Sequence, residues 1–235
     1  MIFYPVGITE LYLAKPKMGK LFNRHSLIAD FGSVKRIPCD KEVIKGSRHT
    51  FIYRPPESIE RDEYTFQSDI YQVGIVLYQL LRGYFPYSER EWLNTREKRV
   101  HAQFSDNFER QQYFDRTVGR KISKGKLLNY SSLPCYISRD LKSTIKKATH
   151  PEITKRYNTA SEFIKALHDF QTKAVNWWEE NGILYAKKHG HFEYRIIKTK
   201  KGKLLVQKRA RNDKWRADNG IVGSIDEITK TINSF

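Results

Sequence analysis

The chain of 235 residues has few cysteines and no long apolar stretch. Only Cys39 and Cys135 are present, and two distant cysteines without companion ligands argue against a disulfide framework or a zinc site. This composition predicts a reducing, cytoplasmic location. No run of 18 or more apolar residues occurs, so we expect no membrane-spanning helix. Residues 1–17 also lack the charge and apolar pattern of a secretory signal.

Acidic residues are scarce as well. The chain holds 26 Asp and Glu against 43 Lys and Arg, a formal net charge of +17. Such an excess favours polyanionic partners, namely nucleic acid, acidic protein faces or anionic membrane, unless it is only a solvated basic surface. The charge is concentrated near the C-terminus, where twelve basic residues oppose two acidic ones between Lys187 and Arg216.

The pattern of apolar residues predicts several helices. "SDIYQVGIVLYQLLRGYFPY", residues 68–87, repeats apolar residues at intervals of three and four and predicts a helix buried nearly all round. Ser68 is placed to cap this helix, and Gly83 to end it. Amphipathic helices are predicted at three further places: 88–104, 138–149 and 159–181. Residues 33–50 predict a long loop, and the tandem prolines of "YRPPE" predict a break.

After Gly182 the pattern changes to alternation. Aromatic and β-branched residues predict three short strands, with a hairpin turn at Gly202 and a last helix capped by Ser224. With the preceding helix, this order has the topology of double-stranded-RNA-binding folds, without their sequence motif. The candidate nucleic-acid-binding residues combine basic side chains with an aromatic ring: Arg195, Lys198, Lys200, Lys201, Lys203, Lys208, Arg209, Arg211 and Trp215.

A second interpretation of this segment is structural. The basic residues would then form the wet face of a sheet whose apolar face packs on the preceding domain. That apolar face would contain Tyr194, Ile196, Leu204 and Val206. Trp177 and Trp178 would join the two parts of the chain.

Four motifs in the first 170 residues occur in a recognisable order. They are "LIADFG" from residue 27, "HTFIYRPPE" from residue 49, the buried helix from residue 68, and "THPEITKRYNTASEFI" from residue 149. In this order they resemble the C-terminal, large lobe of eukaryotic-type protein kinases, over residues 11–170. The resemblance implies a mainly α fold, with a kinase-like large lobe over 1–172 and a small basic α+β domain over 173–235.

The resemblance also implies roles for particular residues. Asp30, with Phe31 and Gly32, would hold Mg²⁺ and the phosphates of ATP, and Asp30 would be the metal ligand. Lys15, in the "LYLAKPKM" segment that resembles the catalytic loop, would contact the transferred phosphate.

Further implied roles concern the architecture of the lobe. Thr50 and Glu57 would belong to the activation segment. Glu57 and Arg156 would form a buried charge pair, and Asp69 would hold the backbone of the catalytic loop.

The chain departs from the kinase pattern in two respects. No G-x-G-x-x-G motif occurs, and residues before Asp30 leave no room for the five strands of a small lobe. In the alignment of "LYLAKPKM", Leu13 stands where the catalytic Asp is expected and Met18 where the metal-binding Asn is expected. Leu cannot accept a proton and a thioether is a poor ligand for Mg²⁺, and no Asp occurs among residues 1–29.

Three functions are compatible with these features. The first is a pseudokinase-like or truncated kinase that acts as a regulatory or scaffolding module through a protein partner. The second is a Ser/Thr kinase subunit or fragment that transfers phosphate from Mg-ATP once a small lobe completes it. The small lobe would be supplied by a partner or by a longer chain. Leu13, Met18 and the initial Met weaken the interpretation as a fragment of a longer kinase. The third is a module that binds nucleic acid, or another polyanion, through the basic C-terminal domain.

Overall fold

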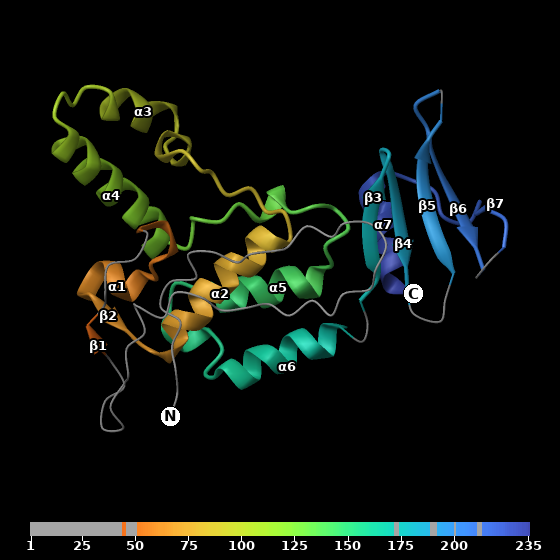
Figure 1. Cartoon of the computed structure of the whole chain (residues 1–235), viewed down its shortest axis with the longest axis horizontal. Coiled ribbons are helices and arrows are strands. Elements are labelled where there is room, and N and C mark those ends of the chain that lie inside the picture. The colour runs from red at the N-terminus through yellow and green to blue at the C-terminus, as the bar shows by residue number, and fades with distance from the viewer. Residues whose placement is uncertain (1–43, 46–50, 172–173, 189–191, 200, 211–212) are drawn as a thin grey trace, which may run out of the picture. The chain divides into compact units, whose positions relative to one another are not determined.

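The computed structural model describes residues 44–45, 51–171, 174–188, 192–199, 201–210 and 213–235 (Figure 1). The chain divides into two compact units. The first consists of residues 1–77, 85–128 and 147–160, and the second of residues 78–84, 129–146 and 161–235. In the described part of the chain, no helix is long and apolar enough to cross a lipid bilayer.

The first unit is helical, with one small two-stranded sheet. Strand β1 (Ile44–Lys45) pairs antiparallel with β2 (Glu63–Tyr64). The main elements of this unit, in chain order, are the 3₁₀ helix η2 (Phe51–Tyr53), α1 (Pro56–Arg61), α2 (Phe66–Leu80), η3 (Glu89–Trp92), α3 (Thr95–His101), α4 (Asn107–Ser123) and η5 (Ile153–Lys155). Of helix α2, the residues up to Leu77 belong to this unit. The pairing of Ile44 corrects the prediction that 33–50 is loop throughout.

Helix α2 confirms the strongest prediction from the sequence, with different ends. Its side chains Ile70, Tyr71, Ile75 and Tyr78 are each at most 4% exposed, whereas Leu80 at its last position is 48% exposed. Ser68 does not cap the helix, because it lies in the first turn and its hydroxyl accepts the Thr65 N–H.

The end of α2 is a Schellman motif. Gly83 N–H donates to Tyr78 O at 3.0 Å and Arg82 N–H to Gln79 O at 2.9 Å, while Arg82 adopts a left-handed conformation with φ 64°. Gly83 follows the helix as predicted. A Cβ at Gly83 would collide with the ring of Tyr78, so only glycine fits against that ring.

The region between residues 88 and 123 differs from the single helix predicted at 88–104. Asn94 interrupts it and caps α3 through a capping box with Glu97. Helix α4, which the sequence pattern did not predict, packs against α1, and Gly119 allows close approach to Ile59. Lys121 of α4 donates to both Trp92 O and Glu97 Oε2, each at 2.6 Å, and so ties α4 to α3.

The second unit contains helices and an antiparallel sheet. Its helical elements include η4 (Tyr130–Ser132), α5 (Arg139–Ala148) and α6 (Ala160–Gln171). The residues of α5 up to Lys146 and those of α6 from Ser161 belong to this unit. Helix α5 confirms the prediction for 138–149. The prediction of one helix over 159–181 is wrong beyond Gln171, because residues 176–180 form a strand.

The sheet of the second unit has five strands in the described residues, in the order of the chain. They are β3 (Asn176–Glu180), β4 (Ile183–Lys187), β5 (Glu193–Lys198), β6 (Leu204–Arg209) and β7 (Arg216–Ala217). The prediction of three strands therefore missed β3 and β7. With five strands between α6 and the last helix, where three were predicted, the order no longer matches the topology of double-stranded-RNA-binding folds.

The predicted turn at Gly202 and cap at Ser224 are both confirmed. Gly202, with φ 80°, donates its N–H to Thr199 O at 2.8 Å between β5 and β6. Ser224 begins helix α7 (Ile225–Ser234) with a capping box, in which its hydroxyl accepts Glu227 N–H and Glu227 Oε2 accepts Ser224 N–H. Hydrogen bonds to Ser224 lower the pKa of the Glu227 carboxyl.

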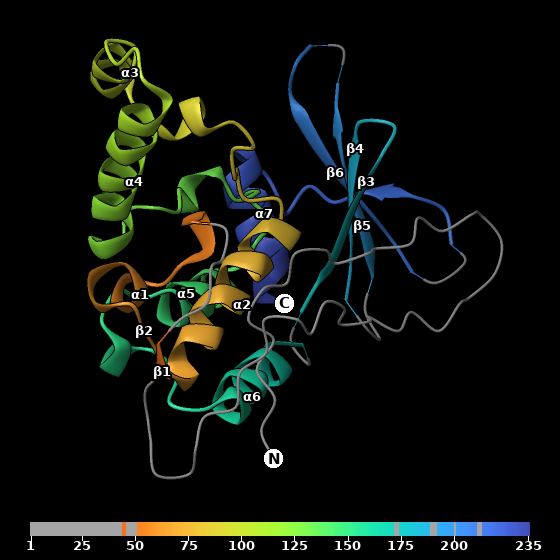
Figure 2. The ribbon, with the colours of Figure 1, turned by 60° about the vertical axis from the view of Figure 1, so that its left-hand side comes forward.

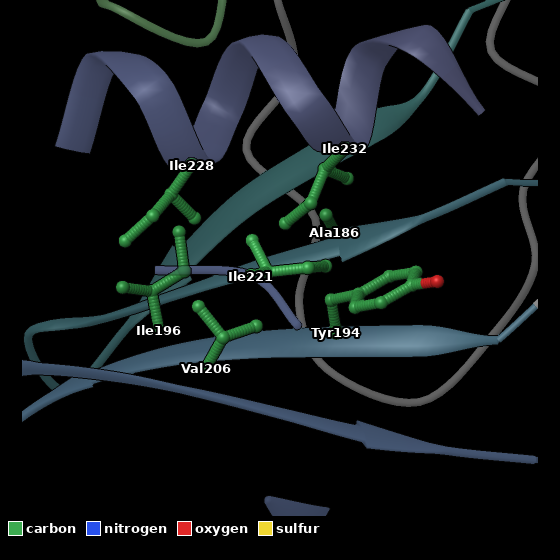
Figure 3. Close-up of a cluster of buried hydrophobic side chains, with 7 residues drawn as sticks. All are labelled: Ala186, Tyr194, Ile196, Val206, Ile221, Ile228 and Ile232. Carbon is green, nitrogen blue, oxygen red and sulfur yellow. The ribbon is translucent and has the colours of Figure 1, made fainter. Parts of the chain in front are cut away.

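Helix α7 covers one face of the sheet, as Figures 2 and 3 show. The buried cluster between them contains Ala186, Tyr194, Ile196, Val206, Ile221, Ile228 and Ile232. Three of the four predicted apolar-face residues are therefore buried, but against α7 instead of the preceding domain. The fourth, Leu204, is 37% exposed.

Candidate functional site

The Pro-Pro-Glu turn begins a helix instead of breaking the chain. Pro55 is the extended N-cap of α1 (φ −73°, ψ 160°), and Pro56 is its first residue, where the missing N–H costs nothing. Glu57 therefore lies in the first turn of α1, and its side chain is 2% exposed. The expectation that the tandem prolines stop regular structure is corrected by this arrangement.

Glu57 and Arg156 form the buried ion pair implied by the resemblance. Arg156 Nη1 donates to Glu57 Oε1 at 2.9 Å and Nη2 to Oε2 at 2.8 Å, and the two side chains are 0% and 2% exposed. Ser68 Oγ donates a third hydrogen bond, of 2.5 Å, to Glu57 Oε1. Such bidentate contact joins residues that are 99 positions apart in the chain.

The remaining N–H groups of Arg156 are bonded to main-chain carbonyls. Nε donates to His150 O at 2.6 Å, Nη1 to Gln67 O at 3.2 Å and Nη2 to Pro151 O at 3.1 Å. Since a guanidinium has five N–H donors, all of them are used. The guanidinium carbon also lies 4.9 Å from the centre of the Tyr71 ring. This site is architectural: its groups are satisfied, and none is left for a substrate.

Asp69 lies next to Ser68 of this network, in the first turn of α2, but in the part of the chain that the structure describes its carboxyl group is not satisfied by hydrogen bonds as that of Glu57 is. Its Oδ2 is buried and has no hydrogen-bond partner among the described residues. Burial raises the pKa of Asp69 from 3.8 to about 8. The catalytic-loop backbone that the resemblance assigns to Asp69 falls outside the described residues, so this role stays a prediction.

The residues predicted to contact nucleotide and metal also lie outside the described residues. They are Lys15, Asp30, Phe31 and Gly32, and Thr50 of the activation segment joins them. Across the part of the chain that the structure describes, no three His, Cys, Asp or Glu side chains gather as a metal site would require. The nucleotide half of the site therefore remains a prediction from the sequence.

The basic C-terminal candidates are divided by the sheet between two faces. The face opposite α7, here called the open face, carries the cross-strand row Trp178, Tyr185, Arg195 and Gln207. Lys208 lies in register with Tyr194 on the α7 side and forms an ion pair of 3.0 Å with Asp218, which raises the pKa of Lys208.

Other candidates lie at the hairpin or outside the described residues. Lys198 ends β5, and Lys201 and Lys203 are exposed in the turn that follows. Lys200 and Arg211 lie outside the described residues.

The open face brings aromatic rings and guanidinium groups together. Arg195 and Arg209 place their guanidinium carbons 4.6 and 4.5 Å from the centre of the Trp215 ring. Trp178 stacks on Tyr185 with 5.3 Å between ring centres and 8° between ring planes.

Sequence reasoning missed Trp178 and Tyr185 as surface residues. It placed both tryptophans at the junction between two parts of the chain, but their side chains lie on opposite faces of the sheet. Trp177 stacks on Tyr136 at 5.7 Å and donates its indole N–H to Asn233, on the α7 side. Trp178 is 39% exposed on the other face, as the alternation of a strand requires. Recognising Asn176–Glu180 as a strand would have found it.

The buried pair, the long buried helix and the Pro-Pro-Glu turn together define a helical kinase-type lobe. The protein kinase domain family matches residues 21–170, which is more than half of the chain. The chain belongs to this family.

Similar proteins match over a short part of their length. G protein-coupled receptor kinase 4 of Mus musculus is 30% identical over 90 residues, which are 36% of this chain and 16% of that protein. Serine/threonine-protein kinase dkf-1 of Caenorhabditis briggsae is 35% identical over 77 residues, 33% of this chain and 10% of that protein. A protein kinase and PP2C-like domain-containing protein of Arabidopsis thaliana is 31% identical over 107 residues, 46% of this chain and 15% of that protein. The chain thus matches about a tenth to a sixth of the length of these proteins.

Proposed function

We propose that this chain is a kinase-fold regulatory or scaffolding module, which acts through a protein partner and does not transfer phosphate by itself. The observation that supports the proposal is a contrast within one fold. The architectural pair of Glu57 and Arg156 is complete, with every guanidinium donor bonded. The loop positions that would do the chemistry carry Leu13 and Met18.

Protein kinases generally use ATP and Mg²⁺. In this chain the donor set at the aligned loop does not fit that use, because neither an aliphatic nor a thioether side chain can replace the oxygen ligands that Mg²⁺ requires. Asp30 alone would supply one carboxylate. We therefore assign no chemical step to this chain and regard the lobe as a surface on which a partner can dock.

Thermal melting of the purified chain with and without Mg-ATP, up to several millimolar, tests the proposal. We expect no rise in Tm, and no transfer of labelled phosphate from ATP to the chain or to a generic Ser/Thr peptide pool. Asp30→Ala serves as the control, and Mg-ATP should leave its Tm unchanged as well. A Tm rise that is lost in Asp30→Ala, together with phosphate transfer, would contradict the proposal.

A double variant sharpens this test. Leu13→Asp with Met18→Asn restores the two side chains that the family pattern expects at those positions. If the wild-type chain does not bind Mg-ATP and the double variant does, Leu13 and Met18 account for the absence of nucleotide binding in the wild type. Mg-ATP binding that appears only when a second polypeptide with a glycine-rich loop and a strand lysine is added would instead favour a kinase completed by a small lobe.

A further inference from the structure

The open face of the sheet carries features that the kinase fold does not use. Alternation along β3 to β6 divides the side chains, and α7 covers the set that includes Tyr194 and Ile196 (Figure 3). The opposite set includes Trp178, Tyr185 and Arg195, which stand in one row across three strands. This second set is only partly buried, and the Trp178 side chain reaches 39% exposure.

The aromatic part of the open face is held in place by its neighbours. The rings of Trp178 and Tyr185 are nearly parallel, and the Tyr185 ring lies 6.1 Å from that of Trp215. Arg195 is fixed by a hydrogen bond of 2.7 Å from its Nε to Gln207 Oε1, so its terminal N–H groups can bind another acceptor. Aromatic planes and forked cations are thus pre-ordered on one surface.

The charge around this face is strongly one-sided. Between residues 183 and 212 the sequence has ten Lys and Arg and one carboxylate, Glu193, and strand alternation adds Glu180 of β3 to the open face beside Trp178. Glu193 accepts from Lys187 at 2.6 Å and from Arg209 at 2.7 Å, which keeps its pKa below the usual range. Lys208 is paired with Asp218 on the α7 side, and two carboxylates cannot neutralise the remaining cations. In the described residues no ion pair is formed by Arg195 or by the hairpin cations, which are Lys198, Lys201 and Lys203.

We propose that the open face binds single-stranded nucleic acid. Phosphates would be held by Arg195, by the outer N–H groups of Arg209 and by the lysines of the β5–β6 hairpin, while a base stacks on the exposed Trp178. The charge excess supplies complementarity to a polyanion, and the rings supply planes that accept any unpaired base. A duplex keeps its bases stacked inside and would leave the aromatic part of this surface unused.

The test measures binding of the full chain to fluorescein-labelled dT20 and U20 by fluorescence anisotropy, at several salt concentrations from 50 to 200 mM. We expect saturable binding to at least one of the two, which distinguishes DNA from RNA. Affinity should fall as salt rises, because each neutralised phosphate contributes about 0.7 to the slope of log K against log salt for a single strand.

Two variants separate the charge from the stacking surface. Arg195→Gln should lower the steepness of the salt slope by about 0.7, since one phosphate contact is lost. Trp178→Ala should weaken binding by about 5- to 100-fold while the slope stays the same, because stacking does not release counterions. Trp178→Phe, which keeps an aromatic plane, should recover part of the affinity.

Matched controls remove the same kinds of side chain elsewhere. Lys230→Gln takes one charge from the exposed side of α7, and Phe108→Ala removes an aromatic ring that is 69% exposed in α4. Both should bind like wild type, and melting curves should show that all variants are folded. If Lys230→Gln changes the slope as much as Arg195→Gln, binding is a property of net charge, and the proposal is wrong. Absence of binding at 50 mM salt, or a folded Trp178→Ala with unchanged affinity, also overturns it.

Discussion

Arginine occurs in opposite settings in the two units of this protein. Arg156 in the first unit is fully buried, and its five N–H donors are bonded to Glu57 and to three carbonyls. Arg209 in the second unit is 37% exposed and shares Glu193 with a lysine. A buried arginine stabilises one arrangement of the chain, whereas an exposed arginine keeps donors for a partner.

The same contrast explains where the family resemblance ends. The family match covers residues 21–170, which include Glu57 and Arg156, and stops before the sheet. Partners of a buried charge are specific, because a lone buried ion costs several kcal/mol, so the residue types are restricted. Cations on a wet sheet face accept many substitutions. The buried charges therefore indicate which fold the chain adopts, and the exposed charges indicate what the molecule can bind.

The largest expected effect comes from breaking the buried pair. Arg156→Met should lower the free energy of unfolding by about 3–5 kcal/mol, because the Glu57 carboxylate is left buried without its partner. Urea unfolding measures this change. Lys155→Met is the neighbouring control: the Lys155–Glu152 pair is exposed, so its loss should leave the urea midpoint unchanged within error. Equal effects of the two variants would contradict the contrast.

A second expected effect concerns the buried carboxyl group of Asp69. Its pKa is raised from 3.8 to about 8, so the folded state holds a proton that the unfolded chain releases near pH 4. The contribution of Asp69 to stability is therefore complete below about pH 4 and is lost as pH rises to about 8. We expect a loss on the order of 1–3 kcal/mol over this range, after allowing for partial solvation.

The measurement compares the wild type with Asp69→Asn, which cannot ionise. Thermal or urea unfolding between pH 4 and pH 8 should show the wild type losing stability relative to the variant as pH rises. If the wild type gains stability relative to the variant instead, hydrogen-bond donors lower the pKa of this carboxyl. That result would fit the role in holding the catalytic loop that the kinase resemblance implies.

A smaller effect is expected where α2 passes close to residues 148 and 149. A Cβ on Gly74 would lie 2.7 Å from Thr149 Cγ2 and 3.0 Å from Ala148 Cβ. Overpacking of this kind costs about 1–3 kcal/mol, which outweighs the gain of about 1 kcal/mol from alanine in a helix. Gly74→Ala should therefore lower the urea midpoint. Adding Thr149→Ser removes one contacting methyl group and should recover part of the loss, measured against Thr149→Ser alone.

The smallest expected effect is on the sheet. Arg209→Gln removes one of the two cations that Glu193 contacts, but Lys187 still bonds to that carboxylate at 2.6 Å. Because the pair is only partly buried, with side-chain exposures of 37% for Arg209 and 16% for Glu193, the loss of stability should be about 0.2–1 kcal/mol. The same urea titration used for Arg156→Met measures it. A loss as large as that of Arg156→Met would show that this partly buried pair is architectural too.

The helices could be predicted from the sequence where periodicity was strong. Helix α2 was found because its apolar residues repeat at three and four, and α5 for the same reason. Helix α4 was missed because its apolar stripe is narrow, with Phe114, Val118 and Ile122 on a mostly polar segment that also contains Gly119. The mistaken cap at Ser68 arose because a serine before an apolar run is a good cap in isolation, whereas here Glu57 takes its hydroxyl hydrogen.

The strand at residues 176–180 shows a different limit. "NWWEE" continues a plausible amphipathic helix when read alone, and its β structure depends on pairing with β4, in which Trp178 stands opposite Tyr185. Strand preference depends on the partner strand as much as on local sequence. Placing Trp177 and Trp178 on opposite faces followed only once that pairing was known.

The sequence by itself determined the identities that matter most: Glu57 with Arg156, the buried helix, and the excess of positive charge near the C-terminus. These follow from residue type and order along the chain. Only the tertiary structure decided which cations share a face, that Lys208 is paired with Asp218, and that Arg195 lies beside Trp215. The physical reason is that strand register and burial set these contacts, and both depend on residues distant in the chain.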